Sequence, residues 1–379
     1  MAFPAAVFIL PAGTLFILSG LIVNAIQIVV FILFRPISRN LFRRINNMLT
    51  QSLWLELIFL IDWWGAIKIE LHMDSESRQL MGKENALLLC NHRSDIDWLI
   101  GFALAQRSGC LGSSLAIMKK ELKYLPVIGW SMWFCDYIFL EREWAKDERT
   151  LSSGLKQLEN SPLPFWLALF VEGTRFTPDK LLAAQAFAAS RGLPIPKNVL
   201  IPRTKGIVCV VENIRSFTPA IYDCTYSVKK GDTPPTMLRL FKGQSSSVKL
   251  QIQRLKMEDL PHTPNEIAEW CKDLFISKDA MLERYNTTDV FSDAELQDLG
   301  RSKKSIFVVL CWTCLLGFLL YEFFKSTKLL STWEGILCTV LFFVVVTLVM
   351  ELLIHSTQSE RSTRMNLPTQ DPLRQKLLQ

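Results

Sequence analysis

The sequence predicts an α/β fold whose sheet is mixed, largely parallel and flanked by helices, with membrane attachments near both ends of the chain. Short apolar stretches alternate with stretches of helical periodicity through the middle of the chain, which is typical of successive βα units. Long uncharged stretches occupy the two terminal regions. Hydrophobic residues make up 50% of the 379 positions, too large a share for a water-soluble chain of this length.

The first segment, Ala2 to Phe34, carries no charged side chain and exceeds the roughly 20 residues that a membrane-spanning helix needs. It lacks the basic start and the short apolar core of a secretory signal, so we expect it to be retained as an anchor. The residues that follow it are basic: Arg35, Arg39, Arg43 and Arg44. The positive-inside rule therefore places the bulk of the chain in the cytosol, with residues 1–44 forming the anchor and its basic flank.

A second apolar and aromatic segment, Leu53 to Gly65, is too short to span a membrane and is interrupted by Glu56 and Asp62. Two interpretations stay open. The segment is either an amphipathic helix at the membrane interface, where its tryptophans suit the headgroup level, or a core helix of the soluble domain.

The central domain covers residues 45–300 and contains the alternating pattern. The predicted strands are Ala86–Cys90, Ser114–Met118, Tyr137–Leu140, Trp166–Val171, Val199–Pro202 and Ile207–Val211. The predicted helices are Trp98–Arg107, Trp144–Glu159, Pro178–Arg191 and Glu266–Tyr285.

Residues 301–379 are expected to form a transmembrane hairpin and a polar tail. Two apolar runs, Ser305–Phe324 and Trp333–Ile354, are joined by a short polar link, and basic residues precede the first run. An even number of crossings returns the tail to the cytosol. From Ser356 to Gln379 the composition is polar and predicts disorder.

The stretch from Asn91 to Asp97 is the leading candidate for catalysis, because a polar cluster here follows a buried strand. His92 and Asp97 are five residues apart, so they can meet if His92 lies in the loop and Asp97 in the first helical turn. A carboxylate so placed fixes the imidazole tautomer and stabilises the imidazolium, which makes the H-x4-D pair a general base. The alternative is a capped helix start with His92 as a surface residue.

A second strand, Trp166–Val171, ends in a turn formed by Glu172, Gly173, Thr174 and Arg175. Glycine permits the turn, and an arginine there can bind a phosphate through two parallel hydrogen bonds. Glu172 can orient the arginine or a substrate hydroxyl. The alternative is a capped turn with a solvated arginine.

Further candidates follow other strands. Lys119 and Lys120 follow one strand and Arg142 another, and all three could reach the same crevice, although charge on a solvated helix face explains the lysines equally well. Ile201 and Pro202 end an apolar stretch and are expected to form a pocket wall rather than a catalytic group.

Charge and cysteine usage exclude several function classes. The net charge of +6 fits an anionic membrane surface or anionic substrates, but no basic run is dense enough to predict nucleic-acid binding. The nine cysteines follow no paired framework, and Cys311 and Cys314 lie in a membrane-like run with no histidine nearby. We therefore expect no metal site and a reducing, cytosol-facing compartment.

Taken in order, four stretches resemble the blocks of the glycerophospholipid acyltransferase family, particularly the plant type of endoplasmic-reticulum 1-acylglycerol-3-phosphate acyltransferases. They are Asn91-His92 with Asp97, Phe139–Arg142, Phe170–Arg175 and Val199–Pro202. The resemblance covers most of residues 10 to 360. Glu141 departs from it, since many members carry aspartate before the arginine.

The resemblance implies transfer of an acyl group from acyl-CoA to the sn-2 hydroxyl of 1-acyl-sn-glycerol 3-phosphate (lysophosphatidic acid), giving phosphatidic acid, without a cofactor. His92 would be the base and Asp97 its support. The substrate-binding residues would be Glu172, Gly173, Thr174 and Arg175, with Arg142, Lys119 and Lys120 sharing phosphate or CoA charge, and with Ile201 and Pro202 in the pocket. The protein would be a multi-pass protein of the endoplasmic reticulum membrane.

Three other readings remain open. Cys90 lies two residues before His92, on the same face of an extended strand, so a thiol acyl-enzyme is conceivable. The acceptor could be another lysophospholipid. A non-enzymatic membrane scaffold is disfavoured, because it would gain nothing from polar clusters at the ends of several strands.

Overall fold

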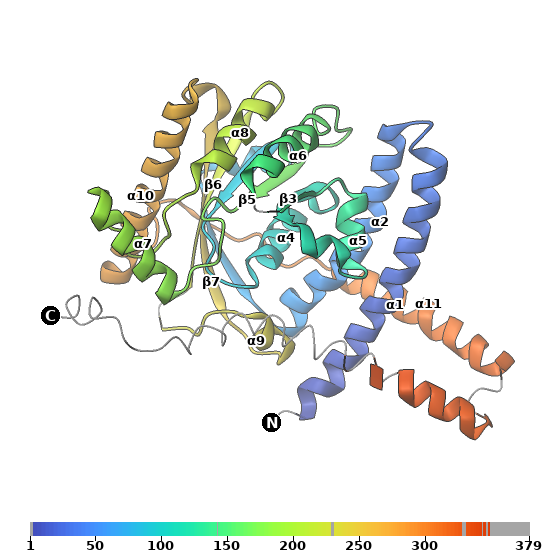
Figure 1. Cartoon of the computed structure of the whole chain (residues 1–379). Helices are drawn as coiled ribbons and strands as arrows, with labels where there is room; N and C mark the ends of the chain where they lie inside the picture. The colour runs from blue at the N-terminus through green and yellow to red at the C-terminus, as the bar shows by residue number, and fades with distance from the viewer. Residues whose placement is uncertain are drawn as a thin grey trace. The chain divides into compact units, whose positions relative to one another are not determined.

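The computed structural model describes residues 3–141, 143–228, 231–327, 331–342, 344, 345 and 348 (Figure 1). The chain divides into two compact units, Met1–Phe318 and Leu319–Gln379. Arg142, the end of the last apolar run and the polar tail predicted to be disordered lie outside the described residues.

An eight-stranded sheet forms the centre of the first unit. Its strands are β1 (Lys68–His72), β2 (Ala86–Cys90), β3 (Ser114–Lys119), β4 (Ile138–Leu140), β5 (Trp166–Leu169), β6 (Ala220–Val228), β7 (Ser247–Lys256) and β8 (Leu296–Gln297). Their spatial order is β4-β3-β5-β2-β6-β7-β1-β8. The pairs β6–β7 and β1–β8 are antiparallel and the others are parallel. The predicted mixed, largely parallel sheet is confirmed.

Helices cover both faces of this sheet (Figure 1). In chain order, the α-helices of the described residues include α1 (Phe3–Phe34), α2 (Arg39–Phe59), α3 (Ser75–Leu80), α4 (Asp97–Arg107), α5 (Ile128–Phe134), α6 (Trp144–Lys156), α7 (Pro178–Arg191), α8 (Thr204–Ile214), α9 (Met237–Phe241), α10 (Pro264–Thr288) and α11 (Lys304–Thr327). The connection through α4 runs along the sheet in the opposite direction to those through α6 and α8. Since such crossovers are right-handed, α4 lies on one face and α6 and α8 on the other. Helix α10 packs beside α8, and α2 beside α4.

Two strand predictions were wrong. Residues 199–202 are irregular. The chain here runs beside the segment after β5: the N–H of Leu200 donates to Glu172, and that of Arg203, the next residue along, to the Val171 carbonyl. Residues 207–211 belong to α8. Their β-branched side chains suggested a strand, but the buried positions Ile207, Val210, Val211 and Ile214 recur at helical spacing.

The anchor segment is the single helix α1, and both α1 and α11 are long and apolar enough to cross a membrane. One side of α1 carries three buried polar side chains that bond to the domain. Ser19 Oγ donates to Glu56 Oε1 at 2.7 Å, and Asn24 Nδ2 donates to Ser131 Oγ at 2.8 Å. Gln27 Nε2 donates to Asn46 Oδ1 at 2.8 Å. We call these three side chains and their partners the α1 polar seam.

The segment Leu53–Gly65 lies in the hydrophobic core, as the end of α2 and a π-helical turn, Leu60–Trp64. Leu53, Trp54, Ile58 and Ile61 are fully buried in it. Asp62 pairs with Arg107 of α4 at 2.6 Å. These side chains pack as the core interpretation expects, while Trp63 at the end of the segment is exposed.

Candidate active site

The carboxyl ends of four parallel strands line one edge of the sheet, in the order β4, β3, β5, β2. Glu141 follows β4, Lys120 follows β3, the turn at Glu172 follows β5, and His92 follows β2. Ligand sites in α/β sheets lie at this edge, where strand ends and helix N-termini converge. The fold thus brings the separate sequence motifs to one place.

The His92 and Asp97 side chains are in direct contact. His92 lies in the loop after β2, Asp97 is the first residue of α4, and the distance from His92 Nδ1 to Asp97 Oδ2 is 2.8 Å. The same oxygen accepts the backbone N–H of Arg93 at 2.7 Å and that of Ser94 at 2.9 Å. The Asp97 side chain is 5% exposed and that of His92 is 26% exposed. The carboxylate therefore orients the ring through Nδ1 and leaves Nε2 to meet a substrate.

Glu172 supports the loop that carries His92. Its Oε1 accepts the backbone N–H of His92 at 2.8 Å, and its Oε2 accepts that of Leu200 at 3.1 Å. Burial raises the pKa of Glu172 to about 7, while these two hydrogen bonds and the charges of Lys278 and Arg93 act in the opposite direction. The carboxylate points at backbone amides, so we interpret Glu172 as a positioning residue rather than the substrate contact expected from the sequence.

The turn after Glu172 depends on Gly173, which has a φ of +66°. A side chain there would be strained, and its Cβ would lie 3.0 Å from Cδ of Arg203. After the turn, the N–H of Phe176 donates to the His92 carbonyl at 2.7 Å. This bond ties the two motifs together through their backbones.

Arg175 and Thr174 are held near the His92–Asp97 pair. Arg175 Nη1 lies 3.8 Å from Asp95 Oδ2, and the arginine side chain is 16% exposed. Lys180, in the first turn of α7, donates to Thr174 Oγ1 and to the Arg175 carbonyl. Three polar side chains from one turn and the helix after it thus form a basic cluster that suits a phosphate.

The remaining candidates lie along the same edge with different partners. Lys120 is exposed and pairs with Glu141, so part of its charge is balanced within the chain. Lys119 is half-buried at the end of β3. Ile201 and Pro202 are half-buried in the segment that bonds to Glu172 and Val171, which places them beside the turn.

Asn91 has a role that sequence reasoning did not assign. Its Nδ2 donates to the Tyr226 carbonyl at 3.0 Å, and its Oδ1 accepts the Tyr226 N–H at 2.7 Å. The side-chain amide thereby continues the β2–β6 pairing by one step and fixes the chain before His92. The only sequence signal for this is an amide residue at the end of an apolar strand.

Cys90 lies opposite Cys224 of β6, and a side-chain hydrogen bond between the two residues, together with burial, raises the pKa of Cys224. Within the described part of the chain, the His92 ring contacts Asp97 and Phe170, and no hydrogen bond joins it to Cys90. No three His, Cys, Asp or Glu side chains among the described residues are grouped as a metal site.

Comparisons with known proteins show the family of the chain. Residues 68–227 match the family model described as Acyltransferase, and residues 239–312 match Acyltransferase C-terminus. The chain is 59% identical over 376 residues to 1-acyl-sn-glycerol-3-phosphate acyltransferase 3 of Arabidopsis thaliana, covering 98% of this chain and 99% of that one. It is 56% identical to acyltransferase 2 of Brassica napus (96% and 93% covered) and 36% identical to the gamma form of Homo sapiens (82% of each).

Proposed function

Since the chain belongs to the 1-acyl-sn-glycerol-3-phosphate acyltransferase family, we propose that it transfers an acyl group from acyl-CoA to the sn-2 hydroxyl of 1-acyl-sn-glycerol 3-phosphate. The products are phosphatidic acid and CoA. The observation that carries the proposal is the His92–Asp97 pair at the carboxyl edge of the sheet.

In the proposed mechanism His92 Nε2 takes the proton of the sn-2 hydroxyl as its oxygen attacks the thioester carbonyl. Asp97 stabilises the imidazolium through Nδ1. The tetrahedral intermediate then collapses, the carbon–sulfur bond breaks, and the imidazolium returns the proton to the departing CoA thiolate. Transfer is direct, and no acyl-enzyme forms.

The acceptor's phosphate is proposed to bind at the turn after β5, where Arg175 and Thr174 converge. Gly173 gives the turn its shape. Arg142, Lys119 and Lys120 are proposed to share the charge of the phosphate or of CoA, and Ile201 with Pro202 to border the acyl or glycerol side of the pocket. No metal or organic cofactor takes part, because the thioester is already activated.

We also propose how the enzyme sits in the cell. Residues 1–44 anchor the chain, residues 45–300 form the acyltransferase domain, and residues 301–379 form a membrane hairpin and tail. The protein is a multi-pass protein of the endoplasmic reticulum with its active site facing the cytosol. Its partners are the two substrates and the lipid bilayer, and it does not bind nucleic acid.

The test is transfer of radiolabelled acyl groups from acyl-CoA by membranes containing the parent or the His92→Ala variant, with a panel of lysophospholipid acceptors. Loss of a general base lowers the rate about 10²- to 10⁴-fold, so His92→Ala should be nearly inactive. The Cys90→Ala control should keep most activity. Near-parental turnover by folded His92→Ala, or a trapped acyl adduct on Cys90, would overturn the mechanism. Preference for another acceptor would replace the proposed substrate.

A further inference from the structure

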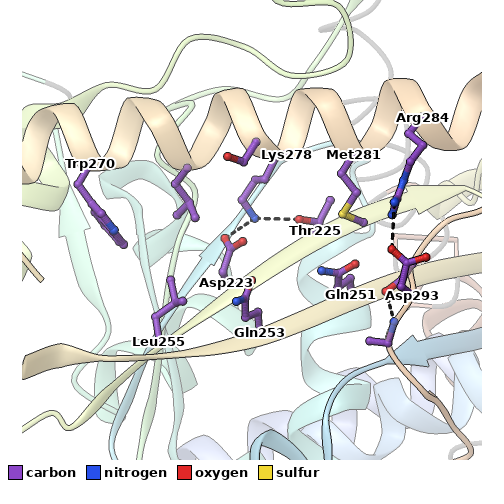
Figure 2. Close-up of a pocket in the computed structure, with 14 residues that line it drawn as sticks. Asp223, Thr225, Gln251, Gln253, Leu255, Trp270, Lys278, Met281, Arg284 and Asp293 are labelled. Carbon is purple, nitrogen blue, oxygen red and sulfur yellow. Dashed lines mark hydrogen bonds and ion pairs between the residues drawn. The ribbon is translucent and has the colours of Figure 1, made fainter. Parts of the chain in front are cut away.

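A buried lysine on α10 lies beneath the active-site edge, far along the chain from every motif of the site. The Lys278 side chain is 1% exposed, and its Nζ lies 2.6 Å from Asp223 Oδ1. Figure 2 shows it reaching from α10 toward Asp223 and Thr225 on β6. A buried ammonium is costly unless it is paired and hydrogen-bonded, so this residue type at this position requires an explanation.

Its hydrogen bonds join two neighbouring strands just before the catalytic loop. Lys278 Nζ donates to the Cys224 carbonyl of β6 at 2.7 Å and to the Leu89 carbonyl of β2 at 3.3 Å. Cys224 pairs with Cys90 in the sheet, and the Asn91 amide extends that pairing. Lys278 therefore fixes β2 three residues before His92.

The charge of Lys278 also acts on Glu172, the carboxylate that accepts the His92 N–H. Glu172 is buried, and Lys278 and Arg93 are the positive groups that favour its ionised form. Burial lowers the pKa of Arg93, while the charges of Glu172, Tyr226, Asp97 and Asp279 act in the opposite direction. A carboxylate must be ionised to accept hydrogen bonds at full strength on both oxygens, as Glu172 does from His92 and Leu200.

We propose that Lys278 is a positioning residue for acyl transfer: it ties the end of β2 to β6 three residues before His92, and its positive charge acts on Glu172, the carboxylate that accepts the His92 N–H. The role rests on the proposed function of the same site. It assigns a task to the C-terminal family region, residues 239–312, which contains none of the catalytic motifs. If Lys278 served only to form an ion pair with Asp223, removing both charges would not change the pH at which Glu172 ionises.

The decisive comparison is between the parent, in which the ion pair is intact, and Lys278→Met/Asp223→Asn. The double variant removes both buried charges together, so neither is left unpaired. A cavity of about 520 Å³ borders both side chains, so the methionine has room to adjust (Figure 2). The measurement is the pH profile of kcat/KM for acyl transfer to lysophosphatidic acid in membranes.

We expect the acid limb of the double variant to move to higher pH by about one unit relative to the parent, since the charge of Lys278 no longer favours the ionised form of Glu172. Lys272→Met is the control, because Lys272 lies on the same helix and pairs with Glu269 on its exposed side. It should keep the parental profile. If the double variant does not accumulate, Lys278→Gln/Asp223→Asn replaces it, since its amide can still donate to the Cys224 carbonyl.

Coinciding acid limbs in the parent and the folded double variant would overturn the role of Lys278 while leaving the proposed function intact. Absence of transfer by the parent itself would overturn the proposed function, and this role with it.

Discussion

Replacing Asp97 by asparagine separates the charge of this side chain from its shape. In the parent, Asp97 Oδ2 accepts His92 Nδ1–H at 2.8 Å and the backbone N–H groups of Arg93 and Ser94 at 2.7 and 2.9 Å. An asparagine oxygen in the same place can accept all three hydrogen bonds. The loop should therefore keep its conformation, and the variant should lose only the negative charge facing the imidazole.

The expected loss of rate follows from the hydrogen bond between Asp97 and His92. A hydrogen bond to a charged group contributes about 1.5–3 kcal/mol, against about 0.5–1.5 for a neutral one. The difference of about 1–2 kcal/mol applies when the imidazolium forms, and each 1.4 kcal/mol or so is tenfold in rate. We expect Asp97→Asn to lower kcat/KM about 5- to 30-fold, less than His92→Ala does.

The assay is the initial rate of phosphatidic acid formation in isolated membranes, with enzyme amounts equalised by immunoblot. Because Asp97 acts through His92, the double variant His92→Ala/Asp97→Asn should be no slower than His92→Ala alone. Additive losses would show that Asp97 acts independently of His92. A larger loss in Asp97→Asn than in His92→Ala would show that it maintains the fold instead, and either result refutes the pair as a unit.

Three further predictions concern the phosphate, the pH dependence and the topology. Arg175→Lys keeps the charge but loses the forked geometry, so it should weaken transfer to lysophosphatidic acid by about 1.5–3 kcal/mol. An acceptor with a neutral group in place of the phosphate should be poor with the parent and lose little further activity in the variant. Equal losses for both acceptors would refute the phosphate assignment. Because Glu172 has a pKa near 7 in the folded protein against 4.5 as its ordinary value, activity should fall as pH drops through about 7. The raised pKa affects the free energy of unfolding in the other direction: it stabilises the folded protein fully below pH 4.5, and this contribution is lost as pH rises through about 7. The denaturation midpoint of the parent should therefore fall relative to that of Glu172→Gln over this range. Protease added to sealed microsomes should cut exposed loops between Ser161 and Ser292, and full protection would reverse the orientation.

The parts of the site that local sequence determines could be predicted. A buried apolar strand followed at once by polar residues marks both β2 with His92 and β5 with Glu172, and the spacing to Asp97 limits how the helix begins. Helices α4, α6, α7 and α10 fall within a few residues of their predicted bounds, because their helical periodicity is also a local pattern.

The rest depends on contacts between distant segments. Strand β6 was missed because its polar residues argue against a buried strand, yet Asp223 and Thr225 are buried against Lys278, more than fifty positions later in the chain. The task of Glu172 is likewise set by two amides from other segments, those of His92 and Leu200. No local pattern records such pairings.

The α1 polar seam bears on any attempt to obtain this enzyme without detergent. Deleting the first helix to gain solubility would remove the partners of Glu56, Asn46 and Ser131 on the domain side. Each such group that stays buried without its hydrogen bond lowers the free energy of unfolding by about 1–3 kcal/mol. The total free energy of unfolding of a typical domain is about 5–15 kcal/mol. The helix is thus a structural member of the catalytic domain, and a soluble version needs apolar-to-polar redesign of its lipid-facing side rather than its removal.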